Sequence, residues 1–495
     1  MEIQKGFVIA GDAILKLSGV SDIEYSEIGG RKLLVVGSEG DSAITVFDVT
    51  DRTSLGIGST IEYDVNTGTQ QLSDLLLIPG ASTAQVISLG RNDDNVGTFE
   101  LAANGDLTQS ASTPGVLFER NVLGAWAQFD GKTFVFATGF GSPGFHSHRL
   151  ENSGTLSQRF TINDGSWSLL ENVTALHYAE LHDKRMLFSA GGLESGFHVF
   201  DVRDSGFPRF EERFGPNDNV FVDNVTDMGA VQIDERAFLV AASFTANALT
   251  VYRVSQGFQL NEVDVYYDTF DTRIARPEAL EIFQTDDRTF VLAGGADDGV
   301  SLFELTYRGK LVHLASRADD FGTTLRAVST IDVQISGETA YAYVGSSTES
   351  GLTELVIDLS RSGQDRRGGA VKDNITGTAG DDVIWGMGKS DTLDGGAGDD
   401  RLIDGRGRDT LIGGEGADIF EFVADGRSDF IEDFEPGIDR IDLSDSSADH
   451  ISDVEIGARK RGAVIKIDDD IIRVYNPDGG PYDVSDWGAD MFIFG

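Results

Sequence analysis

The sequence predicts an all-β chain in which a seven-bladed β-propeller is followed by a parallel β-roll with a C-terminal β cap. Two repeats support this prediction. Apolar strand patterns recur with a period of about 52 residues through the first 360 residues, and units of nine residues rich in glycine and aspartate fill 377–421. Four strands per repeat at a period of about 40–50 residues are typical of propeller blades, and a nine-residue repeat is typical of a parallel β-roll.

The longer repeat contains two recognisable strands in every period. The first strands are expected at 33–36, 85–88, 134–137, 186–190, 238–242, 290–293 and 341–344. Hydrophilic turns such as Gly29-Gly30-Arg31 precede them, and second strands follow, ending near 49, 101, 150, 202, 254, 305 and 359. Each period then holds an inner, two middle and one outer strand. Segment 6–17 is left over, and we expect it to supply the outer strand of the last blade and close the ring. The alternatives are a β-sandwich or a β-helix array.

Composition divides the chain into four regions. We expect the propeller at 1–360, a linker at 361–373, the β-roll at 374–445 and a cap at 446–495. The segment SRSGQDRRGGAVK at 360–372 is glycine-rich and basic and has no apolar run, which favours a linker. A processing site at Arg366-Arg367 is the alternative interpretation of that segment.

Five nine-residue units follow one another from Gly377 to Glu421. Position six is aspartate and position eight is apolar in all five. Ca²⁺ takes 6–8 oxygen ligands, which glycine-rich turns can provide through backbone carbonyls and one carboxylate each. An acidic disordered segment would not need an apolar residue at every ninth position. The candidate metal-binding residues are Gly377, Gly380, Asp382, Asp391, Gly395, Gly396, Gly398, Asp400, Gly405, Gly407, Asp409, Gly413, Gly414, Gly416 and Asp418.

Two units are expected to make one coil, so turns on one side come from alternate units. Metal sites are then expected between Asp382 and Asp400, between Asp400 and Asp418, and between Asp391 and Asp409, which gives roughly three ions. The second unit has Met387 and Lys389 where glycine is usual, and the fourth opens with Asp404. The turn at 387–389 should be the weakest site, because Lys389 brings a positive charge near the cation.

These units match the GGxGxDxUx nonapeptide, and residues 376–495 resemble RTX calcium-binding proteins. The segment FVADGRSDFIEDFEPGIDRIDLS at 422–444 resembles the cap that follows the β-roll in serralysin-type proteins. The end of the chain, Asp490–Gly495, resembles the C-terminal signal of type I secretion substrates. The resemblance implies Ca²⁺ as the cofactor, an extracellular location and the type I secretion apparatus as a partner.

Charge and composition narrow the set of partners. The net charge is −43 and the sequence pI is about 4.3, so nucleic acid and anionic membranes are poor partners. Residues 373–445 contain 20 acidic and six basic residues, which suits a cation-binding segment. There is no cysteine, so metal or packing must hold the fold. No N-terminal signal peptide and no membrane span are expected, because the apolar runs are short.

A ring of carboxylates is expected at the mouth of the propeller channel. Aligning the repeats places Asp22, Asp74, Asp227 and Glu278 at one equivalent position, with Gly124, Ala175 and Ser329 in the other blades. Such carboxylates can bind a cation, activate water or contact a sugar, but a very acidic protein also carries solvated carboxylates there. His177 aligns with Glu24 of the first blade. There is no Gly-x-Ser-x-Gly, His-Glu-x-x-His or phosphate-loop motif, so catalysis stays open.

The function expected from these features is that of a secreted calcium-binding protein whose propeller recognises an extracellular ligand, either a carbohydrate or a surface protein. A secreted hydrolase or lactonase with its active site in the propeller channel is the alternative. A structural component of the cell surface, anchored by the acidic roll, is a third hypothesis.

Overall fold

In the computed structural model, residues 1–494 are described except 12–13, 65–66, 94, 115–120, 140–143, 164–169, 171, 192–195 and 216–223. The chain forms two compact units. Glu2–Gln284 with Thr289–Ile357 make the propeller, and Asp358–Gly495 with Met1 and Thr285–Arg288 make the unit that holds the roll. The described residues include no helix long and apolar enough to cross a membrane.

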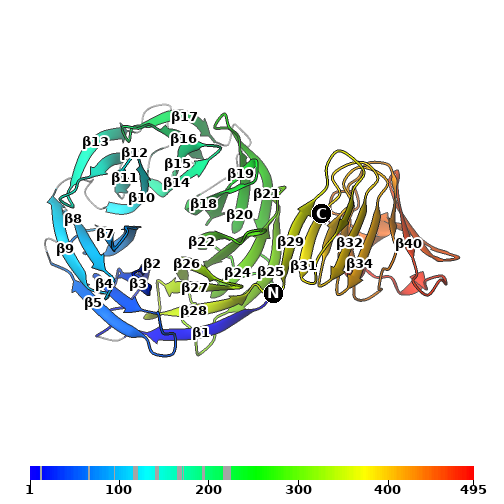
Figure 1. The fold of residues 1–495 in the computed structure, drawn as a ribbon, viewed down its shortest axis with the longest axis horizontal. Helices are drawn as coiled ribbons and strands as arrows, with labels where there is room; N and C mark the ends of the chain where they lie inside the picture. Colours follow the sequence, from blue (N-terminus) through cyan, green and yellow to red (C-terminus); the bar gives the residue numbers. More distant parts are fainter. Residues whose placement is uncertain are drawn as a thin grey trace. The chain divides into compact units, whose positions relative to one another are not determined.

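The propeller has seven four-stranded antiparallel sheets arranged around a central channel, which confirms the predicted fold (Figure 1). In six blades the strands follow the order of the chain from the channel outward. They are β2 (Val20–Ile28), β3 (Arg31–Ser38), β4 (Ala43–Asp48) and β5 (Gly56–Glu62); β6 (Leu72–Ile78), β7 (Thr83–Gly90), β8 (Asn95–Ala102) and β9 (Leu107–Pro114); β10 (Asn121–Phe129), β11 (Lys132–Gly139), β12 (Gly144–Leu150) and β13 (Leu156–Asn163); β14 (Val173–Leu181), β15 (Lys184–Gly191), β16 (Phe197–Val202) and β17 (Pro208–Phe214); β18 (Val225–Ile233), β19 (Arg236–Ser243), β20 (Ala248–Val254) and β21 (Leu260–Tyr267); β22 (Pro277–Gln284), β23 (Thr289–Gly295), β24 (Gly299–Leu305) and β25 (Leu311–Ala318).

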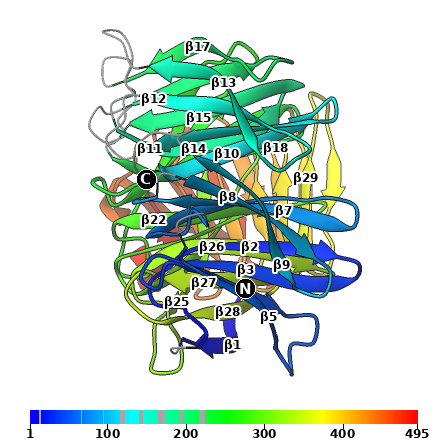
Figure 2. The same cartoon turned by 90° about the vertical axis from the view of Figure 1, so that its left-hand side faces the viewer.

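The seventh blade is closed by the two ends of the propeller sequence. It contains β26 (Val328–Ser336), β27 (Thr339–Ser346) and β28 (Gly351–Asp358), and β1 (Ile3–Ala10) adds the outer strand antiparallel to β28. Figure 2 shows β1 beside β28 at the rim. The leftover N-terminal segment therefore closes the ring as predicted, and both edges of that blade are covered.

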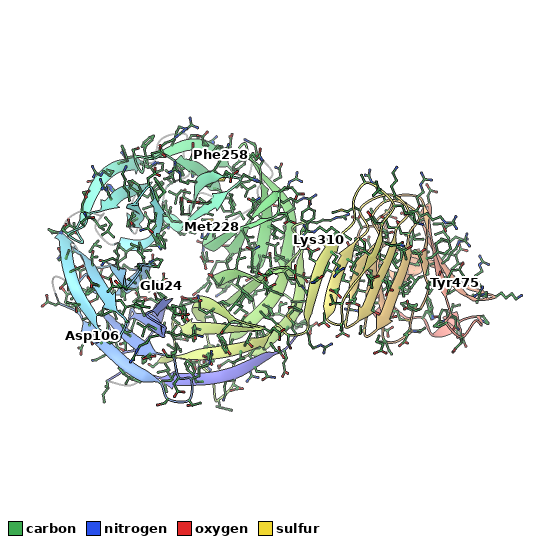
Figure 3. All side chains as sticks on the ribbon, viewed as in Figure 1. Glu24, Asp106, Met228, Phe258, Lys310 and Tyr475 are labelled. Atoms are coloured by element: carbon green, nitrogen blue, oxygen red, sulfur yellow. The ribbon has the colours of Figure 1, made fainter. Side chains whose placement is uncertain are left out.

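Sequence periodicity identified the second strands because they are buried on both faces. In β3, every residue from Leu33 to Ser38 is buried, and the other blades repeat this pattern. In the first, third and fourth blades the inner and second strands are joined by tight turns in which both central residues have positive φ, as at Gly29 (59°) and Gly30 (80°). Such turns match the right-handed twist of paired strands. Figure 3 shows Glu24 at the inner edge of the ring and Asp106 at the outer edge.

The roll is a parallel β-solenoid with two sheets. One sheet contains β29 (Ser362–Arg367), β31 (Asp381–Trp385), β33 (Arg401–Ile403), β35 (Ile419–Glu421), β37 (Arg440–Asp442) and β41 (Phe492–Ile493). The other contains β30 (Asn374–Thr376), β32 (Thr392–Ala397), β34 (Thr410–Glu415), β36 (Ser428–Ile431), β40 (Asp470–Tyr475), β39 (Gly462–Ile467) and β38 (Glu455–Arg459). Three short 3-10 helices lie in the cap: Ile451–Asp453, Val484–Asp486 and Ala489–Met491.

The segment predicted as a linker differs from that prediction. Within 361–373, Ser362–Arg367 forms β29, which pairs in parallel with β31, so the solenoid begins inside the expected linker. This first strand shows no apolar pattern, because backbone hydrogen bonds to β31 hold it and its polar side chains are only partly buried. At the other end, Met491 and Phe492 of the expected secretion signal are buried in the core of the roll, while Gly495 lies outside the described residues.

Candidate metal centres and the propeller channel

The nine-residue units stack in two columns of turns. Strands that follow alternate units pair with a shift of 18 residues, so Val383 lies opposite Arg401 and Thr392 lies opposite Thr410. Units one, three and five form column A, and units two and four form column B. The predicted coil of two units is confirmed. The apolar residues at position eight all lie in the hydrophobic core: Ile384, Leu393, Leu402, Leu411 and Phe420.

One oxygen of each position-six aspartate holds its column together. In column A, Oδ1 of Asp400 accepts a hydrogen bond from the backbone N–H of Asp382 at 2.7 Å, and Oδ1 of Asp418 accepts from that of Asp400 at 2.9 Å. In column B, Oδ1 of Asp409 accepts from the backbone N–H of Asp391 at 2.6 Å. Each aspartate thus fixes the backbone of the turn one coil before it.

The second oxygen of these aspartates is available to another ligand. Oδ2 of Asp391, Asp400 and Asp409 is buried and has no hydrogen-bond partner among the described residues, an arrangement that is costly unless something else binds the oxygen. The glycine at position one leaves space beside it. A Cβ at Gly395 would collide with Oδ2 of Asp400 and lie 2.6 Å from the carbonyl oxygen of Gly413. A carboxylate and a backbone carbonyl therefore face the same small space.

This set of donors fits Ca²⁺. Carboxylate and carbonyl oxygens are the ligands that calcium prefers, and its flexible coordination tolerates irregular turns. The next turn of column A repeats the arrangement, because a Cβ at Gly377 would collide with the carbonyl oxygen of Gly395 and lie 2.6 Å from Oδ2 of Asp382. Asp382 differs in one respect: its Oδ2 already accepts a hydrogen bond from the hydroxyl of Thr378 at 2.9 Å. The ligands expected in each site are the position-six aspartates and the carbonyls of the position-one residues.

The carboxyl groups of the roll are held in an environment that disfavours their charge. Burial, with a smaller contribution from neighbouring aspartates, raises the pKa of Asp400, Asp409 and Asp418 to about 7, although backbone N–H groups oppose the shift. In this environment either a proton or a bound cation must offset the crowded negative charge.

The second unit keeps its turn conformation without the usual glycines. Met387 and Lys389 have φ values of 69° and 89°, in the region that favours glycine. A side chain in this region costs about 1–2 kcal/mol per residue. The backbone strain and the charge of Lys389 support the prediction that this turn binds a cation least well.

Asp404 adds a carboxylate that the expected ligand set did not include. It replaces the glycine at position one of the fourth unit, is buried, and accepts a hydrogen bond from the backbone N–H of Val423 at 2.8 Å. Carboxylate oxygens of Asp404, Asp409 and Asp429 all lie within 4.8 Å of one another. Oδ1 of Asp429 accepts from the backbone N–H of Asp409 at 2.9 Å, so column B continues beyond the last nine-residue unit.

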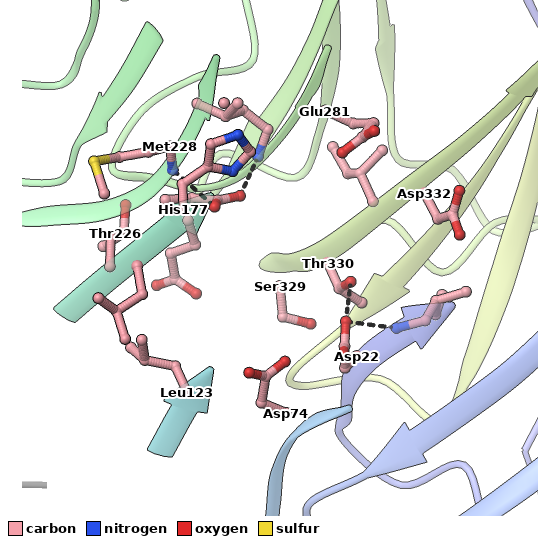
Figure 4. A pocket seen from close by; sticks show the side chains of 18 of the residues that line it. Asp22, Asp74, Leu123, His177, Thr226, Met228, Glu281, Ser329, Thr330 and Asp332 are labelled. Atoms are coloured by element: carbon pink, nitrogen blue, oxygen red, sulfur yellow. Dashed lines mark hydrogen bonds between the residues drawn. The ribbon is translucent and has the colours of Figure 1, made fainter. Parts of the chain in front are cut away.

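The propeller channel holds a cavity of about 510 Å³ lined by the inner strands. The four predicted carboxylates, Asp22, Asp74, Asp227 and Glu278, all line it. Figure 4 shows Asp22, Asp74, Glu281 and Asp332 around this space. No lysine or arginine is among the described residues that line the cavity, so the channel is strongly acidic.

The predicted alignment of the blades is wrong by one residue in three of them. Every inner strand has a bulge near its start, and Asp22, Asp74 and Asp227 follow it. In the sixth blade the residue after the bulge is Ala279, and Glu278 is the bulged residue itself. The equivalent residues elsewhere are Leu123, Ala175 and Thr330, in place of the predicted Gly124, Ala175 and Ser329. Blades differ slightly in length, so a fixed period cannot locate the bulge.

The aspartates of this ring join neighbouring blades. Oδ2 of Asp22 accepts a hydrogen bond from the backbone N–H of Leu75 in the next blade at 2.8 Å, and Oδ2 of Asp227 accepts from that of Leu280 at 2.9 Å. The same oxygen of Asp74 accepts from the backbone N–H of Gly124 at 2.6 Å. Their first role is therefore structural.

A second ring lies two residues further along each inner strand. Its polar members are Glu24, His177, Glu281 and Asp332, opposite Val35, Phe188, Leu292 and Tyr343. The predicted alignment of His177 with Glu24 is confirmed. Nε2 of His177 accepts a hydrogen bond from the backbone N–H of Ala230 at 3.2 Å. Burial lowers the pKa of His177 to about 4, so its imidazole is uncharged at neutral pH.

Glu24, Glu278 and Glu281 differ from the aspartates. None of the described residues donates a hydrogen bond to the carboxylates of these three glutamates. Burial, then repulsion from other carboxylates, raises the pKa of Glu24 and Glu281 well above the ordinary value. Burial also raises the pKa of Asp227 to about 7. Glu24, Glu281 and Asp332 were not among the channel carboxylates predicted from the sequence. Alternate residues of a strand share a face, so the positions two residues after the first ring could have been recognised as channel-facing.

The C-terminal repeats also match a known family. Residues 367–402 and 394–421 match the RTX calcium-binding nonapeptide repeat, in four copies. Among curated proteins, none matches the chain. The match agrees with the aspartate columns and glycine turns of the solenoid. The C-terminal region of this seven-bladed propeller protein thus carries RTX calcium-binding repeats.

Proposed function

We propose that this chain is a secreted calcium-binding protein whose propeller recognises an extracellular ligand at its channel. The observation that supports calcium most directly is the buried Oδ2 of Asp391, Asp400 and Asp409, which has no hydrogen-bond partner among the described residues; that of Asp400 faces a turn built from glycine and carbonyl oxygens. A cation there would satisfy oxygens that hydrogen bonds leave unsatisfied.

Calcium binding is expected to drive folding of the roll. Without the ion, the stacked carboxylates repel one another, and the ionised forms are disfavoured by burial. Because a preformed site does not exist in the unfolded chain, binding energy becomes folding energy. The roll of such a chain would be only marginally stable where calcium is low and would fold stably where calcium is abundant, which suits export through a type I apparatus.

Calcium titration of the full chain, with hydrogen exchange measured on peptides from 377–421, tests this part of the proposal. Protection should be much greater with calcium than with a chelator, while propeller peptides such as 236–243 should be equally protected in both conditions. Protection of 377–421 that is independent of calcium would contradict the proposal.

The channel supplies the ligand-recognition part of the proposal. Glu24, Glu278 and Glu281 face an acidic cavity and have free carboxyl groups that can accept hydrogen bonds from sugar hydroxyls or pair with a cationic side chain of a surface protein. We favour a carbohydrate as the ligand. Raised pKa values keep some of these carboxyl groups protonated, and a protonated carboxyl can both donate a hydrogen bond to a sugar hydroxyl and accept one from it.

The test is binding of the full chain with calcium to an array of neutral glycans. Glu24→Gln and Glu281→Gln together should abolish the strongest binding, whereas Glu27→Gln, at the exposed end of the same strand β2, should not. If both variants bound the glycans equally well, the channel would not be the ligand-binding site.

The raised pKa of the channel carboxyls also favours a second candidate, a secreted hydrolase or lactonase, since acids with raised pKa values are common in active sites. Turnover of lactones or glycosides that is lost in Glu281→Gln would support it. No turnover of either class by the folded, calcium-loaded chain would count against it.

A further inference from the structure

The outer edge of column B carries a basic groove. Its volume is about 710 Å³, and its cationic lining residues are Lys389, Arg406, Arg408 and Arg427, all exposed. None of the four forms an ion pair with a residue that the structure describes. The guanidinium of Arg408 lies 4.7 Å from the centre of the Phe430 ring, which helps to fix its position.

The described lining residues include one acidic group, Asp425, against the four basic ones. The carboxylate of Asp425 accepts a hydrogen bond from the backbone N–H of Gly407 at 2.9 Å through Oδ2 and from that of Arg427 at 2.9 Å through Oδ1. The backbone thus holds this carboxylate in place, and its single negative charge against four cations leaves the lining with a net charge of +3.

Column A has the opposite charge at the corresponding places. Its matching turn positions carry the partly buried Asp381 and the exposed Asp399 and Glu415, and Arg361 lies 3.3 Å from Asp381 and from Asp399. In a chain of net charge −43, a solenoid with one acidic and one basic edge is not explained by average composition. The basic edge calls for an anionic partner.

We propose that the basic groove of column B binds a linear polysaccharide that carries sulfate or carboxylate groups. Successive turns of a solenoid are about 4.8 Å apart, so the cations form consecutive rows along the axis: Lys389, then Arg406 with Arg408, then Arg427. An extended chain lying across the turns meets one row after another. Arginine presents paired N–H donors that match the oxygens of such anionic groups.

Charge argues against wider polyanions. A duplex nucleic acid or an anionic bilayer would bring the acidic surroundings of the groove, such as Asp399 and Glu415 on the other edge of the roll, within range of its own negative charge. A single thin polyanion can contact the groove alone. This site consists of other residues than the propeller channel, so it goes beyond the function proposed above.

The experiment measures binding of the full, calcium-loaded chain to fluorescent dextran sulfate at several salt concentrations, with uncharged dextran as the comparison. Arg406→Gln with Arg408→Gln should weaken binding about ten-fold or more and reduce its salt dependence. Arg459→Gln with Lys460→Gln removes the same charge from the exposed turn of the cap hairpin and should change affinity less than two-fold. The variant with Arg406→Lys and Arg408→Lys should bind dextran sulfate with an affinity between those of the glutamine variant of the groove and the control variant.

Calcium-dependent thermal unfolding of each variant verifies that the roll still folds. If the matched control weakens binding as much as the groove variant, general charge and not the groove is responsible, and the proposal fails. Absence of dextran sulfate binding at low salt, or tighter binding of duplex DNA or of vesicles with anionic lipid, would overturn it as well.

Discussion

Asp400→Asn should change the stability of the roll in opposite directions with and without calcium. Burial raises the pKa of Asp400 from 3.8 to about 7, so its ionised form is disfavoured in the folded chain. About three pKa units correspond to about 4 kcal/mol, and solvent near the turn screens part of it, leaving about 2 kcal/mol. Asparagine removes this charge and keeps an Oδ1 that can accept from the N–H of Asp382.

With a chelator at pH 7.5, the variant roll should therefore be more stable than the parent by about 2 kcal/mol. With saturating calcium the order should reverse, because the amide nitrogen of asparagine cannot replace Oδ2 as a ligand, and a parent at 100 times its dissociation constant gains about 2.7 kcal/mol. Urea unfolding, followed by hydrogen exchange on peptides from 377–421, measures both values.

Asp399→Asn is the matched control, since it removes the same charge from the exposed neighbour and also keeps an Oδ1 for its hydrogen bond from Ala417. It should shift stability by less than about 0.5 kcal/mol in either condition. The reasoning is refuted if Asp400→Asn destabilises the roll in chelator, or if calcium stabilises the variant and the parent equally.

Four further predictions follow from the same geometry. In the fold, the pKa values of Asp400, Asp409 and Asp418 are raised to about 7, so the calcium-free roll should lose stability as the pH rises from about 4 to 7. The calcium affinity should rise over the same pH range, because the ionised carboxylates are the ligands. Urea midpoints and calcium titrations at pH 5 and 7.5 measure the two trends. Lys389→Gly relieves a positive φ of 89° and should stabilise the calcium-loaded roll by about 1 kcal/mol, with Lys372→Gly, outside that strained turn, as the comparison. Asp227→Asn and Glu281→Gln each remove a charge that burial disfavours, but only Asp227→Asn loses one of two backbone hydrogen bonds, those from Met228 and Leu280; its propeller should therefore be less stable than that of Glu281→Gln by about 1–3 kcal/mol in thermal unfolding. Deletion of residues 1–10 removes β1 with buried Ile3 and Ile9 and should cost roughly 3–6 kcal/mol and promote self-association, measured by unfolding and light scattering.

The periodic features of the fold could be predicted because burial repeats with them. The second strand of each blade lies between neighbouring blades, so runs such as Leu33–Val36 are apolar throughout and reveal the period. The apolar residues at position eight of the roll are equally regular, because each fills one layer of a narrow core. Closure by β1 was predictable because a leftover strand pattern preceded the first blade.

Features that depend on hydrogen bonds to the backbone could not be read from the sequence. Strand β29 is held by its pairing with β31 and carries polar side chains, so Ser362–Arg367 looked like a linker. The position of the bulge, which makes Glu278 differ from Asp227, cannot be recognised from the residue types around it. The basic edge of column B was overlooked for another reason: Lys389, Arg406 and Arg408 come together only when alternate units are stacked.

The aspartates of the two regions suggest where a cation can bind. In the propeller, both oxygens of Asp22 and of Asp227 accept hydrogen bonds, so these carboxylates have little left to offer a metal ion. In the roll, Asp400 and Asp409 use one oxygen for the column and keep the other buried and free. The same residue type therefore joins blades in one region and presents a ligand in the other. A cation in the channel would have to rely on Glu24, Glu278 and Glu281, which is why substitutions there, and not at the aspartates, discriminate a binding channel from an acidic structural ring.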